Sequence, residues 1–83
     1  MSSVYTDYFR INKFETDIMN YITDWVHTKK TPVPYKEIIL FMKTQGKGEP
    51  TTANALHNLV KKGYIRRACF TSNKTFFVQL RTL

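Results

Sequence analysis

The chain has 83 residues, a formal net charge of +7 at pH 7 and 42% hydrophobic residues, which suits one folded domain rather than two. Gly and Pro number only three each, so the composition excludes collagen-like, low-complexity and disordered classes. One cysteine excludes an internal disulfide, and with two histidines it is too small a set for a usual zinc site. The longest apolar run, residues 38–42, is far shorter than a bilayer span, and the first residues do not resemble a signal peptide. We therefore expect a small cytoplasmic domain with no metal, no cofactor and no membrane contact.

The positive charge is concentrated in the second half of the chain. Residues 1–35 contain four basic and four acidic side chains, whereas residues 36–83 contain nine basic and two acidic ones. Such a basic half favours contact with the phosphates of a nucleic acid, although it also fits an ordinary soluble basic domain. The function must therefore be argued from the placement of particular residues.

Residues 1–11 lack a helical period and are expected to form an N-terminal arm, with the domain itself at residues 12–83. The arm carries large apolar side chains that suit contact with the domain or with a second copy of the chain. These are Val4, Tyr5, Tyr8 and Phe9.

A first helix is predicted from Asn12 or Lys13 to Thr28, because apolar residues recur there at helical spacing. They are Phe14, Ile18, Tyr21, Ile22, Trp25 and Val26. Asn12 and Glu15 have the spacing of a capping box. The acidic residues Glu15, Asp17 and Asp24 are expected on the solvated outer face of this helix.

Two further helices follow. The prolines of residues 31–34 end the first helix, and a second one is predicted from Pro34 or Tyr35 to Thr44. A third helix begins at Pro50 or Thr51 and ends before Gly63. Its period predicts an inward set of Thr52, Ala55, Leu56, Leu59 and Val60. Its outward set is Thr51, Ala53, Asn54, His57, Asn58 and Lys61.

Beyond Gly63 the sequence is rich in residues typical of β-strands. Residues 64–70 and 75–81 are each predicted to form a strand, and the polar residues 71–74 a turn in which Asn73 can take a positive φ. Cys69 is expected to be a buried residue of the first strand. In the second strand, one face carries Phe76, Val78 and Leu80, and the other carries Phe77, Gln79 and Arg81.

Three helices followed by a two-stranded hairpin make an α+β fold, in the element order of a winged helix-turn-helix domain. In such a domain the third helix presents its polar face to a major groove, and the hairpin, or wing, contacts phosphates or a minor groove. Asn54 and Asn58 lie one helical turn apart and can pair with a base edge, most naturally adenine. Arg66 and Arg67 point to opposite faces of a strand, so we expect only one of them to meet DNA.

The predicted DNA-binding set consists of Thr51, Thr52, Asn54, His57, Asn58, Lys61, Arg66, Arg67 and Lys74. Each of these side chains also has an ordinary explanation as a solvated surface group. The prediction therefore depends on the whole set lying on consecutive elements.

The segment from Phe14 to Leu83 resembles the N-terminal DNA-binding domain of the LexA-type repressors. The resemblance is carried by Ile18-x-x-Tyr21-Ile22, by residues 32–38, and by residues 56–67, where a leucine pair is followed by Lys-Lys-Gly-Tyr-Ile-Arg-Arg. In that family the third helix reads the operator, which by resemblance implicates Thr51, Thr52, Asn54, Ala55 and His57. These 83 residues contain no Ser/Lys autoproteolysis domain, so the resemblance implies neither self-cleavage nor a means of dimerisation.

The sequence thus predicts a small double-stranded DNA-binding protein, either a transcriptional regulator such as a repressor or a genome-organising factor, of a bacterium, plasmid or phage. It would act as a homodimer or higher assembly. The alternative is a protein-interaction module that uses the arm and the apolar hairpin in a larger complex, and RNA binding is a third hypothesis. An enzyme is not expected, because Cys69 and His57 have no orienting acid nearby in sequence and Gly46-Lys47-Gly48 lacks the spacing of a phosphate-binding loop. No small-molecule ligand is predicted.

Overall fold

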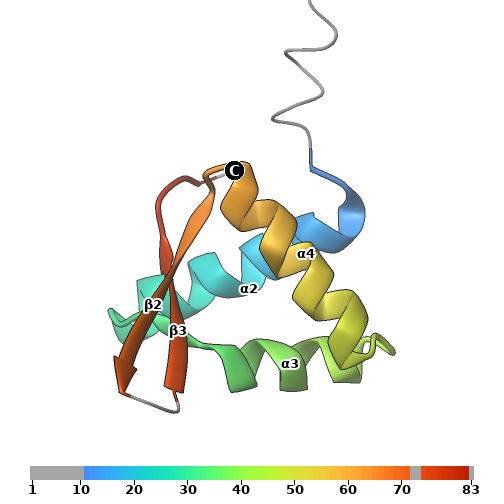
Figure 1. The fold of residues 1–83 in the computed structure, drawn as a ribbon, viewed down its shortest axis with the longest axis horizontal. Coiled ribbons are helices and arrows are strands. Elements are labelled where there is room, and N and C mark those ends of the chain that lie inside the picture. The colour runs from blue at the N-terminus through green and yellow to red at the C-terminus, as the bar shows by residue number, and fades with distance from the viewer. Residues whose placement is uncertain (1–10, 72–73, 83) are drawn as a thin grey trace, which may run out of the picture.

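The computed structural model describes residues 11–71 and 74–82. Over these residues the chain forms an α+β domain with the elements α2 (Lys13–Lys29), β1 (Val33–Pro34), α3 (Tyr35–Thr44), α4 (Glu49–Lys61), β2 (Ile65–Thr71) and β3 (Lys74–Gln79). The strands form one antiparallel sheet in the order β1-β3-β2. Figure 1 shows α4 crossing in front of α2, with α3 below them and the β2–β3 hairpin at one end of the helices. Among the helices of this described part, none is long and apolar enough to span a membrane.

The predicted helices are confirmed, and local sequence explains their ends. Asn12 Oδ1 accepts a hydrogen bond from the Glu15 amide at 2.8 Å, and Glu15 Oε1 accepts one from the Asn12 amide at 3.2 Å, so the predicted capping box begins α2. The helix α4 has Pro50 in its first turn, where a missing amide costs nothing. Gly63 follows α4 with a φ of +82°, a conformation that favours glycine.

The predicted hairpin is confirmed, but the sheet contains a strand that the sequence analysis missed. Val33 and Pro34 pair antiparallel with β3, opposite Phe77 and Phe76. A two-residue strand has no measurable period, and its proline is compatible with a sheet edge. This strand attaches the hairpin to the start of α3.

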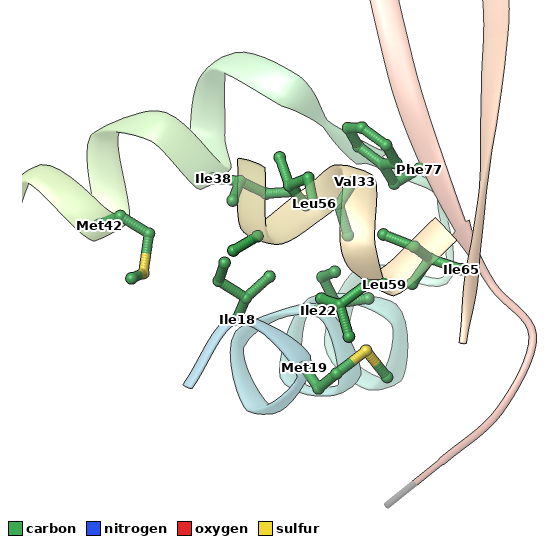
Figure 2. Close-up of a cluster of buried hydrophobic side chains, with 11 residues drawn as sticks. Ile18, Met19, Ile22, Val33, Ile38, Met42, Leu56, Leu59, Ile65 and Phe77 are labelled. Atoms are coloured by element: carbon green, nitrogen blue, oxygen red, sulfur yellow. The ribbon is translucent and has the colours of Figure 1, made fainter. Parts of the chain in front are cut away.

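The core lies where the helices and the sheet meet, and every element contributes to it (Figure 2). Its buried side chains are Ile18, Met19, Ile22, Val33, Ile38, Met42, Ala55, Leu56, Leu59, Ile65 and Phe77. On α4, the predicted inward set is buried except for Val60, which is half-buried. On α2, the buried residues include Met19, which was not predicted, whereas Phe14, Tyr21 and Trp25 are half-buried.

Two predictions about burial are wrong. Glu15 is only 1% exposed, because the side chain of Lys62 reaches across from the end of α4 and pairs with its carboxylate. Cys69 is exposed rather than buried. The buried residue of β3 is Phe77, and its partner on β2 is Arg67. Cys69 lies two residues beyond Arg67, closer to the hairpin turn.

The predicted arm falls outside the described residues, with the exception of Ile11. That residue is partly buried and packs against the core. The arm residues Val4, Tyr5, Tyr8 and Phe9 lie outside the described residues, as does Asn73 of the predicted turn.

Candidate nucleic-acid interface

One face of α4 is lined by exposed polar side chains, as the helical period predicts. They are Thr51, Asn54, His57, Asn58 and Lys61. This face is opposite the one that α4 buries against the core. Asn54 and Asn58 are four residues apart and therefore lie on the same side of the helix. Each amide offers both hydrogen-bond donors and an acceptor, which is the combination that an adenine edge requires.

Thr52 does not belong to this surface. Its side chain is fully buried, and its hydroxyl donates a hydrogen bond to the carbonyl oxygen of Gly48 at 3.0 Å. Its amide donates to the same carbonyl at 3.1 Å. The structure therefore contradicts a DNA-binding role for the Thr52 side chain and gives it a structural one in the first turn of α4. Ala55, implicated by the resemblance to repressors, is also buried.

The end of α4 is fixed against α2 by the ion pair between Lys62 and Glu15. The Lys62 Nζ atom lies 2.8 Å from Glu15 Oε1, and both side chains are largely shielded from water. The same carboxylate caps α2 through the Asn12 amide. Lys62 thus has a structural partner on α2. Its neighbour Lys61 is exposed at the end of α4. No local sequence signal links Lys62 with a residue 47 positions away.

The basic residues of the hairpin divide between its two faces. Arg66 and Arg67 are both exposed and neighbour each other on β2, so their side chains leave opposite faces of the sheet. Arg67 lines a hollow beside the helices, together with Phe77 from the facing strand. Lys74 is exposed at the start of β3.

A hollow of about 250 Å³ lies between the start of α3, the middle of α4 and the hairpin. It is lined by Tyr35, Ala53, Leu56, Arg67, Thr75 and Phe77. Three of these residues carry polar side chains, namely Tyr35, Arg67 and Thr75. The outward position Ala53 lies one turn before His57, so the hollow adjoins the exposed polar face of α4.

Of these residues, only Arg67 was in the predicted site. Tyr35 and Thr75 were missed because the pairing of β1 with β3 places them near each other, and that pairing has no signal in the sequence. The structure also shows that Arg67, and not Arg66, lines the hollow. Strand alternation alone places the two side chains on opposite faces but does not say which face borders the helices.

Tyr35 is held in the hollow by two contacts. Its hydroxyl donates a hydrogen bond to Glu49 Oε2 at 3.2 Å, and its ring centroid lies 6.3 Å from that of Phe77. Burial raises the pKa of Tyr35, and the hydrogen bond to Glu49 and its negative charge raise it further, while the positive charge of Arg67 acts in the opposite direction. The hydroxyl is therefore protonated at neutral pH and lies within the fields of both charges.

A separate aromatic cluster occupies the surface between α2 and α3. Tyr21 stacks on Phe41 with ring centroids 4.3 Å apart, and Trp25 lies 6.2 Å from Tyr21. Trp25 Nε1 donates a hydrogen bond to the Thr31 hydroxyl, and the Lys29 ammonium lies 5.1 Å from the Trp25 ring centroid. The three rings of this cluster are half-buried.

Within residues 11–71 and 74–82, no group of three or more His, Cys, Asp or Glu side chains could hold a metal ion. Comparison with known proteins found no matching protein-family model, curated protein or solved structure. The functional assignment therefore depends on the geometry described above.

Proposed function

We propose that the protein binds double-stranded DNA as a winged-helix domain. In this proposal α4 enters the major groove, and the β2–β3 hairpin acts as a wing on the backbone or in the minor groove. The observed order of elements supports the layout: α3 and α4 are joined by a four-residue connection, and the hairpin follows α4 directly.

The observation that carries the proposal is the chemistry of the exposed face of α4. Asn54, His57 and Asn58 are exposed there together, opposite the buried face. Residues 50–83 contain six Lys or Arg and no Asp or Glu, so no carboxylate from this part of the chain opposes an approaching phosphate. Polar side chains suited to base edges thus belong to a part of the chain that also carries cations suited to the backbone.

The small size of the interface bears on how the protein would act. A single copy of this domain presents few base contacts, so tight site-specific binding requires two copies on paired half-sites or many copies side by side. This is the behaviour of a repressor-like regulator or of a genome-organising factor. A dimer that neutralises six phosphates gives log affinity a slope of about −5 against log salt.

The experiment is a salt-titrated binding assay on long A·T-rich and mixed-sequence duplexes. It compares the wild type with Asn54→Ala/Asn58→Ala and with Asn20→Ala, a control that removes an exposed asparagine from α2. Each bidentate asparagine–adenine pair discriminates by roughly 1–3 kcal/mol, so we expect the double variant to lose at least about tenfold in affinity for its preferred duplex. Binding that ignores Asn54 and Asn58 contradicts the proposal.

The second candidate function is docking to another protein, and the aromatic cluster of Tyr21, Trp25 and Phe41 favours it. The same assay separates the two functions. A docking module shows no salt-sensitive DNA binding even at low salt, and its α4 face tolerates substitution.

A further inference from the structure

We propose that the hollow between α3, α4 and the hairpin holds one sugar–phosphate unit of the DNA backbone, with Arg67 as the cation that binds the phosphate. This proposal rests on the proposed function and adds to it a defined backbone contact. It assigns binding roles to Tyr35 and Thr75, and it distinguishes Arg67 from Arg66.

The hollow lies beside the exposed polar face of α4. Ala53 lines the hollow and lies one turn before His57 on α4. A DNA strand whose bases face Asn54 and Asn58 therefore passes the hollow on its way to the hairpin. Ala53 has the smallest side chain on the outward half of α4 and leaves this approach open. On the other side, β2 brings the exposed Arg67 to the edge of the hollow.

The lining of the hollow combines apolar and polar side chains. Leu56 and Phe77 are buried and make an apolar floor, which suits the carbon atoms of a deoxyribose. The Arg67 guanidinium offers a planar pair of donors that matches two phosphate oxygens. The Thr75 and Tyr35 hydroxyls can donate to the same phosphate.

Glu49 sets a limit on how tightly the phosphate is held. In the free protein its carboxylate accepts a hydrogen bond from the Tyr35 hydroxyl, so a phosphate in the hollow must compete for that donor. The phosphate must also tolerate the negative charge of Glu49 nearby. Glu49 is the last acidic residue of the chain and is exposed at the start of α4. We therefore expect Glu49→Gln to raise the affinity for DNA severalfold, because it removes the charge and keeps the side-chain shape.

The two neighbouring arginines supply a matched pair of variants. Arg67→Ala and Arg66→Ala each remove one exposed positive charge from the same strand, but from opposite faces. In a salt-titrated anisotropy assay, Arg67→Ala should lower the affinity at least about tenfold and reduce the salt slope by about one for each copy of the domain that is bound. The decrease in log affinity for Arg66→Ala should be less than half of the decrease for Arg67→Ala. Tyr35→Phe should weaken binding severalfold and leave the salt slope unchanged, since it removes no charge.

The bound phosphate can be located by duplexes that carry one uncharged methylphosphonate at successive positions. At one position the methylphosphonate should weaken the binding of the wild type and of Arg66→Ala. It should leave the binding of Arg67→Ala unchanged, because that variant has already lost the contact. Far-UV circular dichroism and thermal unfolding show whether each variant retains the wild-type fold.

Each outcome has a distinct meaning. Equal losses for the two arginine variants, or no position at which the loss disappears in Arg67→Ala, overturn the hollow as the phosphate site while leaving DNA binding intact. If the wild type binds no duplex at low salt, the proposed function fails and this inference fails with it.

Discussion

Lys62 and Glu15, which are 47 residues apart in the chain, form an ion pair with a distance of 2.8 Å between Nζ and Oε1. The Glu15 carboxylate also accepts a hydrogen bond from the backbone amide of Asn12, the residue that caps the start of α2. One carboxylate therefore joins the start of α2 to the end of α4. The pair therefore adds a polar contact to the apolar packing of α4 against the core.

Removing the lysine of this pair should destabilise the domain. Lys62→Met leaves the Glu15 carboxylate shielded from water without its cation, and we expect the free energy of unfolding to fall by roughly 2 kcal/mol. Urea unfolding followed by far-UV circular dichroism measures the change. The control is Lys43→Met, which removes an exposed lysine from the last turn of α3. Equal losses for the two variants would show that the pair contributes nothing.

Neighbouring threonines at the start of α4 should separate stability from binding. Thr52→Val removes the buried hydroxyl that donates to Gly48, so it should cost about 1 kcal/mol of stability and leave the exposed face of α4 unchanged. Thr51→Val changes an exposed side chain and should alter stability by less than about 0.5 kcal/mol while weakening DNA binding. Thermal unfolding and the duplex assay, run on both variants, check the two effects. If Thr52→Val weakened DNA binding and Thr51→Val destabilised the domain, the structural role given to Thr52 would be wrong.

A cavity in the core should be costly for so small a domain. Leu59→Ala removes a fully buried side chain of α4 and should lower the free energy of unfolding by about 3 kcal/mol. Leu80→Ala shortens a leucine that is 54% exposed and should cost less than about 1 kcal/mol. Chemical denaturation of both variants measures the difference. Similar losses would mean that the packing around Leu59 differs from the one described.

Alkaline pH should test the surroundings of Tyr35. Its pKa is raised in the folded protein, so the folded state favours the neutral phenol, and this contribution to stability is present below pH 10 and is lost as the pH rises through the raised pKa. Glu49→Gln removes a charge that raises the pKa, so Tyr35 should ionise at lower pH in that variant. Absorbance titration at the tyrosinate band, with Tyr35→Phe to identify the signal, measures the shift. An unchanged titration in Glu49→Gln would contradict the contact between the two side chains.

The parts of the fold that the sequence predicts are those encoded by neighbours in the chain. The capping box joins Asn12 and Glu15, which are three positions apart, and the inward and outward faces of α4 follow from its period alone. For the same reason, the exposed positions of Asn54, His57 and Asn58 were predicted correctly.

The parts that were missed depend on contacts between distant segments. The strand β1 becomes visible only when Val33 pairs with Phe77, and the burial of Glu15 follows from a lysine at the other end of the domain. The hollow needs both α3 and the hairpin in place before Tyr35 and Thr75 share a lining. Periodicity contains no information about such pairings, because they are set by tertiary packing.

The most direct test of the central claim is a titration of the ¹⁵N-labelled protein with a short A·T-rich duplex at low salt, followed by NMR. The account predicts that the side-chain amide signals of Asn54 and Asn58 shift, together with the backbone amides of α4 and the Arg67 region, while the Asn20 amide and the Trp25 indole stay in place. Shifts centred on Trp25 and Tyr21, or no shifts at all, would contradict DNA binding through α4.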